Sequence, residues 1–209
     1  MSVASPLDVS PVIPVVQLPT HPDPSVAGVA LARALVAGGV AIIEVTLRTE
    51  GAVRAIRSIR EQVPEILVGA GSVLDVGGLD ASLTAGAQFI VTPGTSQALR
   101  AALGDVDVPV LPGAGSVSEV LELRDAGHAE IKVFPAEPLG GPAFLKALLG
   151  PVAGVRICPT GGITQASAPA YLELDRVPCV GGSWLTPPDL VITENWPAIT
   201  ALARAASDR

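Results

Sequence analysis

The sequence is poor in lysine, in aromatic residues and in long uncharged apolar segments, and these shortages exclude several classes of protein. Only two of its thirteen basic residues are lysines, Lys132 and Lys146. Aromatic residues make up 3% of the 209 residues and charged residues 16%. No apolar segment approaches about 18 uncharged residues, so no transmembrane helix is expected. The net charge of −7 argues against general nucleic-acid binding, although backbone N–H groups can still bind a small anion.

Histidine and cysteine are also scarce, and the few present do not have the spacing of metal ligands. Cys158 and Cys179 lie in strand-like segments and are expected to be small buried hydrophobic residues. His21 and His128 do not cluster with carboxylates, and His128 precedes a strand, where a structural role is expected. We therefore predict that the protein uses no metal ion and no cofactor.

The amino-terminal segment lacks the basic and apolar regions of a signal peptide. This absence predicts a cytoplasmic protein without a membrane partner. Residues 1–10 are interpreted as a lead-in and residues 11–209 as a single compact domain. Because charged residues are few, part of the exterior is expected to be buried in an oligomer.

Eight short segments rich in β-branched residues recur along the chain. After the first gap they follow one another at intervals of about 22 residues, the length of a strand, a helix and two tight loops. Each segment is therefore predicted to be a strand. They are Val12–Val16, Val40–Val45, Ile66–Val68, Phe89–Val91, Val108–Leu111, Ile131–Val133, Val155–Ile157 and Val177–Val180.

The intervening segments have the apolar spacing of helices. Val26–Val36 and Ala52–Val63 are predicted helices, and Ser116 or Ser118 is expected to cap a later one. Eight strand–helix units predict an α/β fold, a compact (β/α)8 TIM barrel. An open doubly wound sheet is the alternative. It needs a phosphate-binding fingerprint after the first strand, and Gln17–Thr20 does not provide one.

Lys132 lies in the apolar segment Glu130–Pro135, where an isolated ammonium group is costly to bury. It must therefore be paired, neutral or chemically active. A neutral lysine amine can attack a ketone and form an imine that withdraws electrons, and burial favours the neutral form. The alternative is a structural ion pair with Glu44 or Glu130, and the strand position alone favours neither. Lys146 is expected to be a solvated helical lysine.

Glu44 and Arg48 follow one another at the end of the second predicted strand. In a barrel, the carboxyl ends of the strands form the site, so both are expected near Lys132. Glu44 is either a proton shuttle or a salt-bridge partner of Lys132 or Arg48. The planar guanidinium of Arg48 suits a substrate carboxylate. The alternative is a surface arginine at the start of the second helix.

Two glycine-rich segments follow the seventh and eighth predicted strands. They are Thr160-Gly161-Gly162 and Gly181-Gly182-Ser183. Glycine lets backbone N–H groups approach an anion closely, and a hydroxyl group adds a donor. Either segment alone is usually only a turn. Because barrels often bind phosphate after these two strands, the pair predicts a phosphate site.

Six motifs together resemble the 2-keto-3-deoxy-6-phosphogluconate (KDPG) aldolase family, which also includes 4-hydroxy-2-oxoglutarate aldolases. The resemblance extends from about Val12 to the last helix. It implies a metal-independent class I aldolase that cleaves 2-dehydro-3-deoxy-6-phosphogluconate to pyruvate and glyceraldehyde 3-phosphate, and a homotrimer of small barrels. The motifs are Ala34–Gly39, Glu44–Thr49, Val68–Val73, Lys132–Glu137, Cys158–Ile163 and Gly181–Leu185.

The resemblance also implies a role for each residue that matches a family position. One position departs from many relatives, because Ser72 stands where they have threonine; its hydroxyl group is retained. A second departure is Pro138-Leu139, which follows the lysine strand. By the resemblance, Lys132 forms the imine, Glu44 is the general acid and base, Arg48 and Ser72 hold the substrate carboxylate, Thr160, Gly161, Gly162 and Ser183 bind phosphate, and Pro93 and Phe134 line the pocket.

Two other functions compete with this interpretation. One is a 4-hydroxy-2-oxoglutarate aldolase that uses the same lysine and produces pyruvate and glyoxylate. The other is a barrel without catalysis, which binds a phosphosugar or serves as a scaffold, with Lys132 in a buried ion pair. A covalent pyruvyl adduct on the lysine separates the enzyme from the scaffold.

Overall fold

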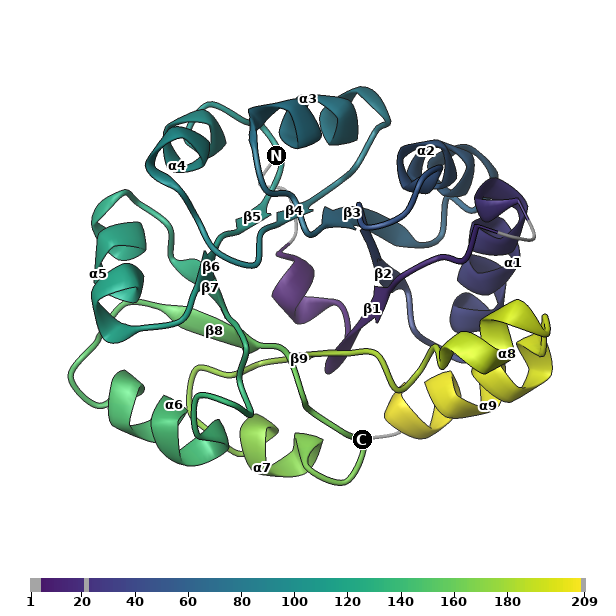
Figure 1. Cartoon of the computed structure of the whole chain (residues 1–209). Helices are drawn as coiled ribbons and strands as arrows, with labels where there is room; N and C mark the ends of the chain where they lie inside the picture. Colours follow the sequence, from purple (N-terminus) through teal and green to yellow (C-terminus); the bar gives the residue numbers. More distant parts are fainter. Residues whose placement is uncertain (1–4, 21–22, 208–209) are drawn as a thin grey trace.

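The computed structural model describes residues 5–20 and 23–207, and it shows an α/β fold of parallel strands (Figure 1). Residues 1–4 of the predicted lead-in and His21 lie outside the described residues. Every paired strand in the described chain runs parallel to its neighbour. The strands are β1 (Val12–Val16), β2 (Ile42–Thr46), β3 (Leu67–Gly71), β4 (Ile90–Val91), β5 (Val110–Leu111), β6 (Gly113–Ala114), β7 (Glu130–Val133), β8 (Arg156–Pro159) and β9 (Val180–Gly182).

The strands form two curled sheets, with the helices around their outer side (Figure 1). One sheet has the order β5-β4-β3-β2-β1-β9 and the other the order β6-β7-β8. A single bridge between Thr160 and Gly181 connects the end of β8 with β9. The order follows the sequence without the reversal that a doubly wound sheet requires, so the alternative fold does not fit.

The helices cover the apolar sides of the sheets, and several are capped by short polar side chains. Ser116 accepts a hydrogen bond from the N–H group of Glu119, so Ser116 and not Ser118 is the cap of α5. The helices are α1 (Pro24–Ala37), α2 (Ala52–Gln62), α3 (Val76–Thr84), α4 (Gln97–Leu103), α5 (Val117–Asp125), α6 (Gly141–Leu149), α7 (Ala168–Leu172), α8 (Pro188–Ile192) and α9 (Trp196–Ser207). No helix in the described parts of the chain combines the length and the apolar character needed to cross a membrane.

Only the first predicted strand has its predicted limits in the structure, and two of the others differ in their pairing or their position. The fifth, predicted at Val108–Leu111, is shorter and is followed by a second short strand beyond Pro112, which has no N–H group to continue the ladder; β5 pairs with β4 and β6 pairs with β7. The eighth was predicted at Val177–Val180 and that placement is wrong, since β9 begins only at Val180, beyond Pro178, and continues through two glycines.

The amino ends of the strands are closed by the 3-10 helix η1 (Pro6–Asp8), which belongs to the predicted lead-in. Leu7 is buried in the core with 1% of its surface exposed. Ser5 donates a hydrogen bond of 2.7 Å to Glu130 at the start of β7. Arg156, at the start of β8, donates bonds to Asp8 and, at 2.9 Å, to Glu130. This end of the molecule is therefore a closed network of ion pairs.

Candidate active site

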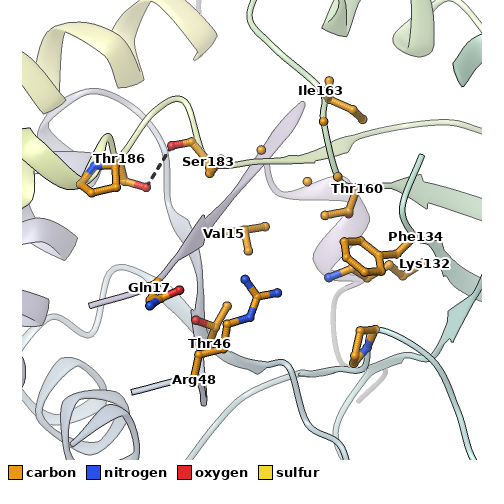
Figure 2. Close-up of a pocket in the computed structure, with 16 residues that line it drawn as sticks. Val15, Gln17, Thr46, Arg48, Lys132, Phe134, Thr160, Ile163, Ser183 and Thr186 are labelled. Atoms are coloured by element: carbon orange, nitrogen blue, oxygen red, sulfur yellow. Dashed lines mark hydrogen bonds between the residues drawn. The ribbon is translucent and has the colours of Figure 1, made fainter. Parts of the chain in front are cut away.

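The carboxyl ends of the strands surround a pocket with a volume of about 300 Å³. Parallel α/β folds generally place their sites at this end of the sheet, since the loops after all strands meet there. Figure 2 shows side chains from both sheets converging on the same space. The lining residues are Val15, Gln17, Thr46, Arg48, Pro93, Lys132, Phe134, Thr160, Gly161, Gly162, Ile163, Gly181, Gly182, Ser183, Thr186 and Pro188.

Lys132 lies at the inner end of this pocket, on β7, with only 4% of its surface exposed. Its Nζ atom is 3.3 Å from Oε1 of Glu44 and 5.7 Å from the centre of the Phe134 ring. Of the two predicted ion-pair partners, the structure selects Glu44, because Glu130 points to the opposite end and binds Arg156. An ammonium group has three donors, and this one makes a single hydrogen bond in the described chain.

Glu44 is buried on β2, with 2% of its surface exposed, and contacts Lys132 from behind the pocket wall. The space for its carboxylate comes from Gly71 at the end of β3, where a Cβ atom would overlap Oε1 and would lie 2.5 Å from Cγ. A residue with a side chain at position 71 would therefore displace the carboxylate. Glu44 does not itself line the pocket, so Lys132 stands between it and the open space.

Arg48 extends from the loop after β2 into the pocket and is largely exposed to solvent. Its Nε atom donates a hydrogen bond of 2.9 Å to Oγ of Ser72. Ser72 follows β3 in the left-handed backbone region, with a φ of 56°, which aims its hydroxyl group at Arg48. Ser72 does not line the pocket. The guanidinium group thus points toward the space in front of Lys132, with its terminal nitrogens available (Figure 2).

The glycines of the two segments have different structural roles. Gly161 and Gly162 form a loop with φ angles of 102° and 81°, a conformation that favours glycine. Gly181 and Gly182 were predicted to lie in a loop after the eighth strand; they form part of β9 instead. There, a Cβ atom at Gly181 would overlap the Thr160 side chain, so the glycine allows β8 and β9 to approach closely.

The segment after the lysine strand holds the glycine loop in place. The N–H group of Ala136 donates to the carbonyl of Thr160 at 2.8 Å, and that of Glu137 donates to the carbonyl of Gly161 at 3.0 Å. A Cβ atom at Gly162 would lie 2.6 Å from Cβ of Glu137. The lysine strand and the predicted phosphate loop are therefore coupled through backbone hydrogen bonds.

Pro93 follows β4 of the six-stranded sheet and lines the pocket, and hydrogen bonds hold its segment against β6. The hydroxyl group of Thr92 accepts a 2.8 Å hydrogen bond from the N–H group of Gly113, where β6 begins after the break at Pro112. The hydroxyl group of Thr95 donates to the carbonyl of Gly113 at 3.0 Å. A Cβ atom at Gly113 would overlap the Pro93 backbone, so these two segments are in direct contact.

The pocket also contains residues to which the motifs gave no role. Val15 lies on β1 and Gln17 follows this strand, Thr46 ends β2, and Thr186 and Pro188 come from the chain after β9. Alternation along a strand would have identified Thr46 from the inward position of Glu44 two residues earlier. The residues after β9 have no such signal, because their position depends on the path of a loop. Ile163, the last residue of the Cys158–Ile163 motif, also lines the pocket without a predicted role.

The two cysteines are buried, as predicted; Cys158 lies on β8 and Cys179 directly precedes β9, where the two thiols interact. The Cys158 thiol, and burial, raise the pKa of the Cys179 thiol, which favours the unreactive protonated form. Within residues 5–20 and 23–207, no three histidine, cysteine, aspartate or glutamate side chains are grouped as they would be around a metal ion.

Comparison with known proteins adds independent information. The model of the KDPG and KHG aldolase family matches residues 3–202 of this chain. The KHG/KDPG aldolase of Escherichia coli strain K12 is 46% identical over 205 residues, which cover 98% of this chain and 94% of that protein. The 2-dehydro-3-deoxy-phosphogluconate aldolase of Dickeya dadantii is 45% identical over 200 residues, with coverages of 96% and 92%.

The fold has a close match among crystal structures. The KDPG aldolase of Legionella pneumophila superposes with a TM-score of 0.92 and 40% identity, and the match covers 96% of each chain. That structure contains pyruvate captured as a covalent carbinolamine intermediate. The similarity therefore covers both the sequence and the arrangement of the chain in space.

Proposed function

The chain belongs to the KDPG and KHG aldolase family, as its motifs predicted, and we propose that it is a class I aldolase. Its substrate is 2-dehydro-3-deoxy-6-phosphogluconate, which it cleaves to pyruvate and glyceraldehyde 3-phosphate. The observation that carries this proposal is the buried amine of Lys132, which faces the pocket and has Glu44 at 3.3 Å. The covalent pyruvate intermediate of the Legionella relative supports it.

The reaction begins with the Lys132 amine, which adds to the C2 ketone of the substrate to form a carbinolamine. Loss of water gives a protonated imine, which draws electrons from the neighbouring carbon atoms. Proton exchange with Glu44 leaves the lysine neutral for its attack. Arg48, held by Ser72, binds the carboxylate next to the ketone through charge-assisted hydrogen bonds.

The carbon–carbon bond breaks in the next step. Glu44, directly or through a water molecule, removes the proton of the C4 hydroxyl group while the electrons of the C3–C4 bond pass to the imine. Glyceraldehyde 3-phosphate leaves, and the remaining enamine is protonated at C3. Water then hydrolyses the imine, which releases pyruvate and restores the lysine. The predicted phosphate site of Thr160, Gly161, Gly162 and Ser183 holds the other end of the substrate, so both ends are fixed about the reacting carbons.

The scaffold of this site is a (β/α)8 barrel in our proposal, with residues 11–209 as its single domain and residues 1–10 as a lead-in. The Thr160–Gly181 bridge supports closure on one side of the two sheets. On the other side, β5 and β6 are separated only by Pro112 and pair with different sheets, which supports closure there. Counting the broken strand once gives the eight strand positions that the sequence predicts.

Borohydride reduction in the presence of pyruvate tests the proposed chemistry. Reduction converts a Lys132 imine into a stable secondary amine, which intact mass detects and peptide mapping locates. We expect one pyruvyl group on Lys132 and none on the solvent-exposed Lys146. If the protein remains unmodified under conditions that trap an imine, the aldolase proposal fails and the scaffold alternative takes its place.

A second substrate is favoured by the dual name of the Escherichia coli relative. That relative is a KHG/KDPG aldolase, which points to 4-hydroxy-2-oxoglutarate as an additional substrate with the same imine chemistry. Ser183→Asp places a negative charge beside the predicted phosphate site. We expect this variant to lose activity on the phosphorylated substrate and to keep activity on 4-hydroxy-2-oxoglutarate. Equal losses on both would remove the phosphate role from Ser183.

Three further properties stay predictions. A homotrimer is expected, which sedimentation or light scattering can measure. Metal-independent catalysis is expected, and full activity after treatment with a chelator checks it. A cytoplasmic location is the third.

A further inference from the structure

Gln17 occupies a distinctive position at the mouth of the pocket. It follows β1, where Val15 lines the pocket, and it lies on the same side of the chain two residues later. Val15 pairs with Glu44 in the β1–β2 register. Gln17 therefore stands beside Thr46, one layer closer to the mouth than the buried carboxylate (Figure 2).

The strand order places Gln17 between the two ends of the proposed substrate. β1 has β2 on one side and β9 on the other. Arg48, the proposed carboxylate ligand, follows β2, while Ser183, from the proposed phosphate site, follows β9. A ligand that spans from Arg48 to Ser183 must pass the end of β1. Its central carbon atoms consequently lie next to Gln17.

Two hydroxyl groups that line the pocket with Gln17 are already engaged. The hydroxyl group of Thr46 donates to the carbonyl of Val16 at 2.9 Å, and that of Thr186 donates to the carbonyl of Ser183 at 3.5 Å. The side-chain amide of Gln17 makes no hydrogen bond within the described chain. It is a neutral group with both donors and an acceptor, which suits a hydroxyl group better than a carboxylate or a phosphate.

We propose that Gln17 is a specificity residue, whose amide hydrogen-bonds the C5 hydroxyl group on the aldehyde half of the substrate. This inference rests on the proposed aldolase function and extends it. Gln17 selects substrates whose aldehyde portion is a hydroxylated chain over those that release glyoxylate, which has no hydroxylated carbon beyond the aldehyde. Pyruvate binding and imine formation do not involve it.

The variant Gln17→Met tests the proposal, because methionine keeps the length of the side chain and removes its hydrogen-bonding groups. Loss of hydrogen bonds to a substrate hydroxyl is expected to lower kcat/KM for the phosphorylated six-carbon substrate about tenfold. The value for 4-hydroxy-2-oxoglutarate and the exchange of pyruvate methyl protons with deuterium are expected to remain unchanged. Gln62→Met, an exposed glutamine at the end of α2, is the matched control.

Other outcomes separate this inference from the proposed function. Unchanged kcat/KM in Gln17→Met, or an equal loss for both substrates, would overturn the specificity role while leaving the aldolase proposal intact. A loss of pyruvate proton exchange would also overturn it, since Gln17 would then act at the pyruvate end. The aldolase proposal itself is tested separately: it fails if the wild-type protein forms no borohydride-trapped adduct with pyruvate.

Discussion

Strand β7 carries an ionisable residue at each of two consecutive inward positions, and their surroundings differ sharply. Glu130 lies at the amino end, where Ser5 and Arg156 both donate to its carboxylate and η1 closes the space beneath. Lys132, two residues later, has one hydrogen bond to Glu44 and faces a pocket of about 300 Å³. The same strand thus supports a closed ion network and an open, incompletely bonded amine.

This difference separates a structural charge from a chemically useful one. When a buried or half-buried charge is fully hydrogen-bonded, its hydrogen bonds offset the cost of removing it from water, and it has no donor or acceptor left for a ligand. An amine with unused donors beside a cavity retains the capacity to bind or react. Variants at the two ends of the molecule should therefore affect different measurements: catalysis at the carboxyl ends of the strands and folding stability at the amino ends.

The largest effect is expected from Lys132→Met. Removing the proposed nucleophile should lower turnover of the phosphorylated substrate at least about 10³-fold and abolish the pyruvyl adduct, because no other lysine lines this pocket in the described chain. Circular dichroism should show a folded protein. Lys146→Met, which changes the exposed lysine of α6, is the control and should retain full activity. Near-normal cleavage by Lys132→Met would show that cleavage requires Lys132 no more than it requires Lys146.

A second effect at the same end should come from Gly71→Ala. Its new Cβ atom would overlap the Glu44 carboxylate, whereas its backbone lies outside the left-handed region and tolerates alanine. We expect turnover to fall about 10²-fold, the usual contribution of a positioned acid or base. Gly94→Ala is the matched control, since no atom lies within 4 Å of its added Cβ. Equal activity of both variants would show that Glu44 has no role in proton transfer.

At the amino ends, Arg156→Met should change stability instead of chemistry. The variant leaves Glu130 and Asp8 without their cationic partner. Because these side chains are partly exposed, the expected loss in the free energy of unfolding is about 1–2 kcal/mol, measured by denaturant titration. Pyruvate trapping should be unaffected. Arg124→Met, which removes a surface ion pair with Asp125, should cost less.

Much of this arrangement could be predicted from the sequence because it follows from local patterns. The β-branched segments located β1 at its observed limits, Val12–Val16, and their regular spacing indicated strand–helix units and so parallel strands. Lys132 was recognisable as a charged residue within an apolar segment, and its place on a strand at the barrel mouth predicted that it faces the site. Its pairing with Glu44 instead of Glu130 was not predictable, because it depends on which strands lie opposite one another across the interior.

The unpredictable features depend on contacts between segments that are distant in sequence. Nothing local indicates that Glu137 donates its N–H group to Gly161, or that the glycines of β9 serve close packing against Thr160. Gln17 was considered only for the phosphate fingerprint that it lacks. Its place between Arg48 and Ser183 follows from the order of β2, β1 and β9, which becomes known only when the sheets are assembled.

The smallest expected effect concerns His128, which precedes β7 at the amino end. Burial lowers the pKa of its half-buried imidazole below the ordinary value of 6.5. The unfolded chain therefore takes up a proton at a higher pH than the folded protein does, so stability should fall as the pH decreases through 6.5 toward the lower folded pKa. Because the ring is partly exposed, the loss should stay below about 1 kcal/mol.

Unfolding titrations between neutral and mildly acidic pH should show that stability depends less on pH in His128→Asn than in the wild-type protein. The pH profile of cleavage should be the same in both proteins, and a shifted profile would mean that the two ends of β7 are coupled.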